Sequence, residues 1–140
     1  MTQQRATYAQ AGVDVESGER AVELMRASIV ASTRPEVVGD FGGFAGLFDI
    51  SAAKLMRKPL LATSTDGVGT KIAVARALDI HHTVGLDLVA MVVDDLVVCG
   101  AEPLFMTDYI AVGSVNPERI ASIVSGIARG CELAGCSLVG

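Results

Sequence analysis

Residues 64–71, with the sequence STDGVGTK, place an acid, two glycines, a hydroxyl and a lysine close together. Gly67 and Gly69 would let backbone amides approach an anion, and Lys71 would add a positive charge. Asp66 would repel a bare phosphate, so its presence favours a divalent cation between the carboxylate and the phosphate. Mg²⁺ is commonly held in this way, by one or two carboxylates and the substrate's phosphates. The alternative is a tight Asp-Gly turn after a strand, without a ligand.

The same segment does not match two common phosphate-binding motifs. A Walker loop needs four residues between its first glycine and the Gly-Lys pair, and a Ser or Thr after the lysine. Here one residue separates Gly67 from Gly69, and Ile72 follows Lys71. Ile72 also stands where the dinucleotide fingerprint G-x-G-x-x-G requires its third glycine. A generic P-loop kinase is therefore excluded.

A second group of acids lies on an apolar segment, 83–99, which we expect to be a helix buried in the core or against a partner. Asp87 and Asp94 lie about 20° apart around such a helix, and Asp95 is next to that face. Burying an unpaired carboxylate costs folding free energy, so these acids should lie at a solvent-exposed edge, pair with Arg or Lys, or coordinate a cation. Together with Asp66, the oxygen-only set favours Mg²⁺.

Length, charge and cysteine content limit the classes of protein to which this chain can belong. The 140 residues fit one domain, and no apolar run approaches the roughly 18 residues that a membrane span needs. The net charge is −5, the eleven basic residues are scattered and there is no Trp, which excludes a nucleic-acid surface. Three cysteines without a CxxC pair and no signal peptide favour reduced thiols and a cytoplasmic location. The adjacent His81 and His82 would face different ways and make a poor metal pair.

Residues 1–16 lack periodicity and are predicted to form an arm, and residues 17–140 the folded domain. The predicted helices cover 18–32 with Ser17 as N-cap, 71–78, 83–99 ending at Gly100, and 117–134 between Asn116 and Gly135. The apolar face of the first helix is predicted to consist of Val22, Met25, Ile29 and Val30. That of the last helix is predicted to consist of Ile120, Ile123, Val124, Ile127 and Ala128.

Strands are predicted over 47–50, 60–64, 103–113 and 136–139, with a glycine-rich loop over 39–51. The last strand reaches residue 140 with no element after it, so we expect the chain to be a piece of a longer polypeptide.

Five segments then carry a family resemblance: YAQAGVDVESGE, GGFAGLF, STDGVGTK, GLDLVAMVVDDLVVCGAEPLF and SGIARGCELAGCSLVG. From about residue 8 to residue 140, the chain resembles the N-terminal half of the aminoimidazole ribonucleotide synthetases, or phosphoribosylformylglycinamidine cyclo-ligases. DGVGTK together with DDLVVCGAEPLF distinguishes this family from its relatives. These are formylglycinamidine ribonucleotide synthetase, selenophosphate synthetase, thiamine-monophosphate kinase and a hydrogenase maturation factor.

The resemblance implies an α/β (α+β) domain whose mostly antiparallel sheet is flanked by helices and forms a central β-barrel across a homodimer. It also implies ATP-dependent ring closure of formylglycinamidine ribonucleotide to aminoimidazole ribonucleotide in purine biosynthesis. The family's second domain, with the rest of the substrate pocket, is expected to lie outside these 140 residues. We therefore expect this piece alone to be inactive.

Carried over position by position, the resemblance makes Asp66 and Asp95 the carboxylates of a Mg²⁺–ATP site and, with Lys71, its catalytic groups. Asp94 stands where the family often has Asn, which makes its role as a third metal ligand less secure. The implied ATP-binding residues are Gly67, Gly69, Thr70 and Lys71 against the triphosphate, and Gly42, Gly43 and Gly46 in a flexible loop over ATP. Asp108 and Tyr109 are candidates for facing the substrate, or simply form a strand edge.

Two alternatives stay open. The first is another ATP-using enzyme of the same superfamily. The second is a catalytically silent dimerisation module that keeps the barrel but binds no nucleotide.

Overall fold

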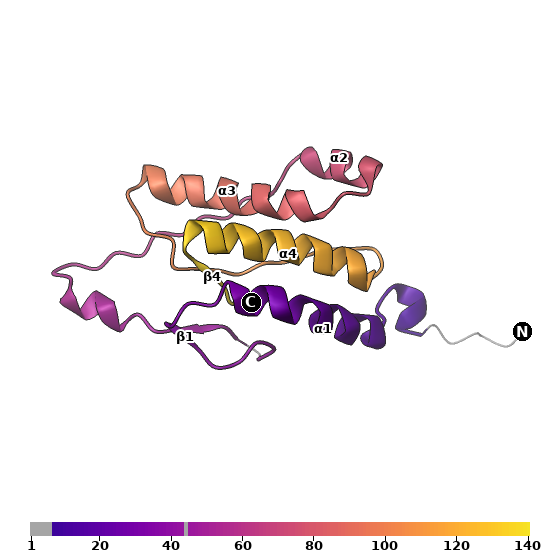
Figure 1. The fold of residues 1–140 in the computed structure, drawn as a ribbon, viewed down its shortest axis with the longest axis horizontal. Coiled ribbons are helices and arrows are strands. Elements are labelled where there is room, and N and C mark those ends of the chain that lie inside the picture. The colour runs from indigo at the N-terminus through magenta and orange to yellow at the C-terminus, as the bar shows by residue number, and fades with distance from the viewer. Residues whose placement is uncertain (1–6, 44) are drawn as a thin grey trace, which may run out of the picture.

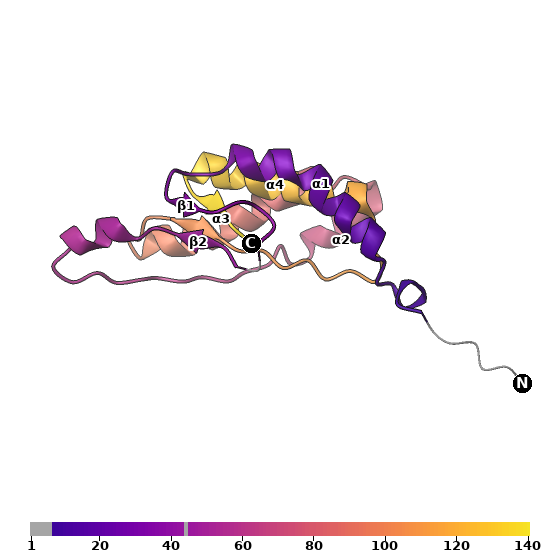
Figure 2. The same cartoon turned by 90° about the horizontal axis from the view of Figure 1, so that it is seen from below.

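The computed structural model describes residues 7–43 and 45–140. Three long helices form a layer, with α4 (Pro117–Ala134) lying between α1 (Val15–Ala31) and α3 (His82–Val98). The short strands and the long connecting segments lie on one side of this layer (Figures 1 and 2). The smaller elements are η1 (Ala9–Ala11), β1 (Val37–Val38), β2 (Leu47–Phe48), η2 (Ser51–Leu55), α2 (Lys71–Leu78), β3 (Phe105–Met106) and β4 (Ser137–Leu138).

Helix α1 begins earlier than predicted. Asp14 is its N-cap, because one carboxylate oxygen accepts a hydrogen bond from the amide of Glu16 at 3.1 Å. Ser17, predicted as the cap, instead donates its hydroxyl to the other oxygen of Asp14 at 2.9 Å. Asp and Ser are both good caps, so local sequence did not separate them. The helix thus starts inside the segment assigned to the arm, whose residues 1–6 lie outside the described residues.

The buried face of α1 also differs from the prediction. Ala21 and Ile29 are buried and Met25 is partly buried, whereas Val22 and Val30 are exposed. The face therefore follows an i, i+4, i+8 row that includes a small residue. Ala21 is buried although its small side chain gives only a weak apolar signal in the sequence.

Helices α3 and α4 approach each other at the level of their backbones. A Cβ built on Gly126 would overlap the carbonyl oxygen of His82, and one built on Gly85 would lie 2.5 Å from the carbonyl oxygen of Ile123. The core beside this crossing includes Val89, Ile127 and other residues of α4. Since α4 packs against both α1 and α3, it buries more than the single predicted face; the additional buried residues are Gly126, Gly130 and Cys131.

The ends of α4 confirm the sequence prediction. The side-chain oxygen of Asn116 accepts a hydrogen bond from the amide of Arg119 at 2.8 Å, and Pro117 is the first helical residue. Gly135 ends the helix with φ of 72°, a left-handed conformation that glycine adopts without strain.

We expect Asn116→Ala to lower the free energy of unfolding by about 1 kcal/mol, because the amide of Arg119 would lose its partner. Urea denaturation of the full-length protein followed by circular dichroism measures this change. Asn116→Asp is the matched control, since aspartate caps a helix equally well. Equal losses in both variants would contradict a capping role.

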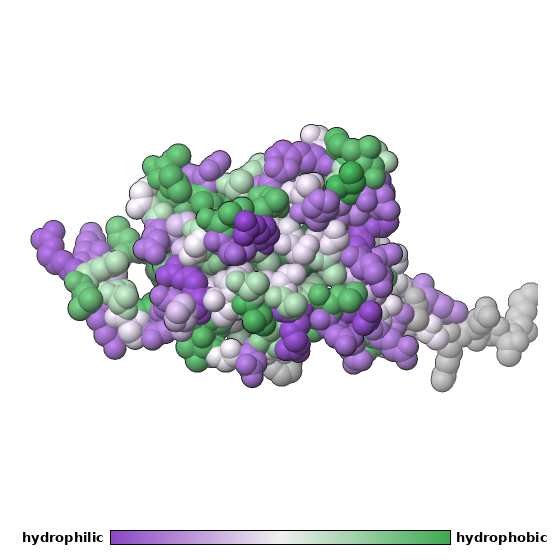
Figure 3. Space-filling view, in the orientation of Figure 1, coloured by the Kyte–Doolittle hydropathy of each residue, from purple (hydrophilic) through white to green (hydrophobic). Residues whose placement is uncertain are grey.

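Helix α2 has the predicted bounds, and α3 lies within one residue of them. In the single chain α3 is not buried in the core along its whole length, and its predicted burial against a partner stays a prediction. Only Val84, Gly85 and Val89 are buried, while Val97 and Val98 are 59% and 83% exposed. In the single chain α3 packs one face against α4, so its acids lie at an exposed surface. Figure 3 shows hydrophobic residues gathered over α2 and over the C-terminal end of α3.

The described residues form two small sheets. β1 pairs antiparallel with β2, and β3 pairs parallel with β4. The sheet was predicted to be mostly antiparallel, and one of these two strand pairs is antiparallel. β1 was not predicted, and the predicted strand 103–113 is paired only at Phe105–Met106.

The predicted strand over 60–64 is absent, and Leu60 and Leu61 are 80% and 77% exposed. A strand needs a neighbouring backbone to pair with, and within the described part of the chain this segment has none.

Candidate functional site

The segment 64–71 is attached to α3 near both of its ends. The hydroxyl of Ser64 donates a hydrogen bond of 2.7 Å to Oδ2 of Asp95. At the other end, Nζ of Lys71 lies 3.3 Å from Oδ1 of Asp87. Asp87 and Asp95 are eight residues apart, which is about 12 Å along a helix. The segment therefore runs beside the acidic, exposed part of α3, toward α2 (Figure 2).

Asp66 lies in this segment and is exposed, as is Asp95. Oδ1 of Asp66 accepts a hydrogen bond of 2.6 Å from the amide of Gly67. This contact is local, and the turn in this segment lies at residues 69–70, so the Asp-Gly turn considered from the sequence does not form at residues 66–67. Asp66 is exposed, so a cation can reach its carboxylate.

Among residues 7–43 and 45–140, no group of three or more His, Cys, Asp or Glu side chains is arranged to hold a metal ion. A cation bound here would therefore take at most two carboxylate ligands from the described residues, and its other ligands from uncharged oxygens, phosphates and water. That division suits Mg²⁺, which usually keeps several waters and binds through one or two carboxylates and substrate phosphates. The oxygen-only chemistry of Asp66 and Asp95 fits this ion, and Asp94, exposed on the same helix, makes no third member of such a group.

The two histidines do not form a metal pair in the structure. His81 is buried with Nε2 at 2.9 Å from Oδ1 of Asp79, while His82 is exposed. The His81 contact and Arg119 hold the pKa of Asp79 below its usual value. This cluster joins the α2–α3 turn to α4, which is a structural role.

The glycines and the start of α2 provide the groups that a phosphate needs. Gly69 has φ of +55°, a conformation that favours glycine, and nothing lies within 4 Å of the place of its missing side chain. Gly67 is equally open. Thr70 is the N-cap of α2 but makes no side-chain capping bond, so the positive end of this short helix is not neutralised by its own cap. Lys71 is the first residue of the helix.

The glycine loop 39–51 is a β1–β2 hairpin, and Phe44 in it lies outside the described residues. Gly42 has φ of +105°, and no atom of the described residues lies within 4 Å of the place of its missing side chain. Gly46 packs closely against Val139, and a Cβ there would lie 2.8 Å from that of Val139. Packing thus explains Gly46 without a ligand, while closure of the loop over ATP stays a prediction.

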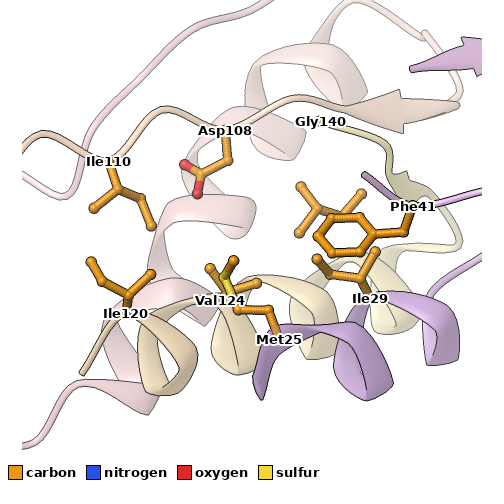
Figure 4. A pocket seen from close by; sticks show the side chains of 9 residues that line it. Met25, Ile29, Phe41, Asp108, Ile110, Ile120, Val124 and Gly140 are labelled. Atoms are coloured by element: carbon orange, nitrogen blue, oxygen red, sulfur yellow. The ribbon is translucent and has the colours of Figure 1, made fainter. Parts of the chain in front are cut away.

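Asp108 and Tyr109 point in different directions. Asp108 lines a half-open cavity of about 240 Å³ between α1, α4 and the segment after β3, with apolar residues such as Ile29 and Val124 around it (Figure 4). Burial raises the pKa of the Asp108 carboxyl. Tyr109 is 91% exposed. The two residues therefore do not share one surface, and a common substrate-facing role stays untested.

Ser64 is the residue at this site that the sequence prediction did not include. It precedes the Asp-Gly pair by two positions, but a lone serine carries no signal of its own. Its partner Asp95 is 31 residues away in the chain, so only the fold reveals the contact.

The fold and this segment define a mixed α/β domain with an acidic, glycine-containing segment lying along a helix. The family described as AIR synthase related protein, N-terminal domain, matches residues 47–140. The chain belongs to this family, which confirms the resemblance found in the sequence.

Relatives of known name match almost the whole chain. A phosphoribosylformylglycinamidine cyclo-ligase of Desulfitobacterium hafniense is 54% identical over 96% of this chain and 39% of its own length. Enzymes of the same name from Geobacillus thermodenitrificans and Thermosynechococcus vestitus are 56% and 57% identical, each over 95% of this chain and 38% of the relative. The chain thus spans about two fifths of the length of these relatives. None of the helices in the described residues is long and apolar enough to cross a membrane.

Proposed function

We propose that this chain is the ATP-binding N-terminal part of a cyclo-ligase that converts formylglycinamidine ribonucleotide to aminoimidazole ribonucleotide in purine biosynthesis. The names of the relatives support the reaction. The observation that most supports the site is the Ser64–Asp95 hydrogen bond, because it attaches the segment that carries Asp66 and Lys71 to the helix that carries Asp95.

In this reaction the formyl oxygen of the substrate attacks the γ-phosphorus of ATP, and the bond to the β-phosphate oxygen breaks to release ADP. The ring-forming nitrogen then attacks the activated carbon, and inorganic phosphate leaves as the imidazole closes. The protein must mainly position the γ-phosphoryl group and stabilise its charge, since phosphoryl transfer needs little other chemistry.

Each group of the segment has a role in this proposal. Asp66 and Asp95 would hold Mg²⁺, which neutralises triphosphate charge when bound, and Asp94 would contribute less. The amides of Gly67, Gly69 and Thr70 would approach the phosphates. Lys71 would exchange its exposed contact with Asp87 for a phosphate oxygen, which costs little because exposed ion pairs are weak. Gly42, Gly43 and Gly46 would belong to a loop that closes over the nucleotide.

We also propose that the protein is a cytoplasmic homodimer in which the strands of two copies form a central β-barrel. Large apolar side chains that are exposed in the single chain support a partner, because surfaces of this kind mark interaction sites. They include Leu55, Leu60 and Leu61. Light scattering on the purified full-length protein tests this, and a monomer at micromolar concentration would contradict it.

An ADP-release assay on the full-length protein tests the proposed reaction. We expect ADP to form only when formylglycinamidine ribonucleotide, ATP and Mg²⁺ are all present. Release with thiamine monophosphate instead would favour another ATP-using member of the superfamily. The absence of both turnover and a thermal shift with Mg²⁺–ATP would favour a silent dimerisation module.

A further inference from the structure

We propose that Ser64 is a positioning residue that orients Asp95 toward a metal-bound nucleotide. This inference rests on the proposed function. Its basis is the 2.7 Å hydrogen bond from the Ser64 hydroxyl to Oδ2 of Asp95, which joins the connecting segment to α3. The contact uses one oxygen of the carboxylate and leaves Oδ1 for a cation.

Asp95 needs such a partner because it is exposed on a helix surface and its side chain would otherwise sample several rotamers. Ordering a mobile side chain at the moment of binding costs affinity, and a preformed hydrogen bond removes that cost in advance. Ser64 is half-buried, so it is a better-ordered anchor than a fully exposed hydroxyl. Groups that orient metal ligands in this way commonly change metal affinity by about 10- to 100-fold.

The same hydrogen bond places the start of the segment that carries Asp66 next to Asp95. Ser64 and Asp66 are two residues apart, so their Cα atoms are at most about 7 Å from each other. Ser64 touches Asp95 directly, so the segment reaches α3 two residues before Asp66. A single hydroxyl thus attaches the segment that carries Asp66 to the helix that carries Asp95.

Loss of the Ser64 hydroxyl is not expected to free the whole segment. At its other end the segment continues into α2, which contacts α3. The effect of a substitution should therefore appear in metal-dependent binding rather than in folding.

Calorimetric titration of ATP into the full-length protein, with excess Mg²⁺ and with EDTA, tests this role. We expect Ser64→Ala to weaken Mg²⁺–ATP binding by about 10- to 100-fold and to leave metal-free ATP binding and the melting temperature unchanged. Ser64→Thr keeps a hydroxyl and should restore most of the affinity. Thr65→Ala, at the exposed neighbouring position, is the matched control and should bind like the wild type.

Three outcomes would overturn the inference. The first is Mg²⁺–ATP binding by Ser64→Ala within twofold of the wild type, and the second is an equal loss with and without Mg²⁺. The third is an undiminished effect of Ser64→Ala when Asp95 is already asparagine, because the serine would then act elsewhere. If the wild type itself shows no Mg²⁺-dependent binding, the proposed function fails too. If Asp95→Asn abolishes that binding and Ser64→Ala does not affect it, only this inference fails.

Discussion

Asp95→Asn should weaken the binding of Mg²⁺–ATP to the full-length protein by at least about a hundredfold, or about 2.8 kcal/mol. The substitution keeps the shape of the side chain and its capacity to accept the Ser64 hydrogen bond, but removes the negative charge that a cation needs. Isothermal titration calorimetry with Mg²⁺–ATP measures the change. We expect Asp66→Asn to produce a loss of similar size, because both carboxylates are assigned to the same ion.

Asp94→Asn is the matched control for this prediction. Asp94 is the neighbouring acid on α3 and is also exposed, but it does not join Asp66 and Asp95 in a three-carboxylate group. Its replacement removes the same charge from the same surface, so a general electrostatic effect would appear in all three variants. We expect less than a fivefold change for Asp94→Asn. Equal affinities for the wild type, Asp66→Asn and Asp95→Asn would remove the proposed site.

Gly126→Ala should reduce the free energy of unfolding by about 3 kcal/mol or more, the upper end of what overpacking of a core usually costs. The added methyl group would overlap the carbonyl oxygen of His82, and backbone cannot rotate away as a flexible side chain can. The helices α3 and α4 would have to separate, and the core beside them, including Val89 and Ile127, would lose contacts. Chemical denaturation of the full-length protein, followed by far-ultraviolet circular dichroism, measures the loss.

Gly18→Ala, in α1 of the same helical layer, is expected to raise the free energy of unfolding instead of lowering it. No atom lies within 4 Å of the place of its missing side chain, so alanine fits there without overlap. Because glycine in a helix is less favourable than alanine, we expect Gly18→Ala to raise the stability by about 0.5–1 kcal/mol. A loss at Gly126 no larger than about 1 kcal/mol would show that the two helices can move apart easily.

Much of the helical structure follows from the sequence because its signals are local. Asn116, Pro117 and Gly135 mark the ends of α4, and each acts through the backbone of its own turn. The bounds of α2 and α3 also agree with the prediction to within one residue. The chemical content of segment 64–71 is also readable from the residues themselves, since an acid, glycines and a lysine at these spacings suit a metal-bound phosphate.

The tertiary structure decides what depends on neighbours that are distant in the chain. Residues 60–64 have the composition of a strand but find no pairing partner among the described residues, and β1 forms only because β2 lies beside it. Which face of α1 is buried depends on where α4 lies, and α3, which packs mainly against α4, keeps Val97 and Val98 exposed. The contact between Ser64 and Asp95, on which the proposed site rests, likewise exists only because the fold brings a connecting segment to the surface of a helix.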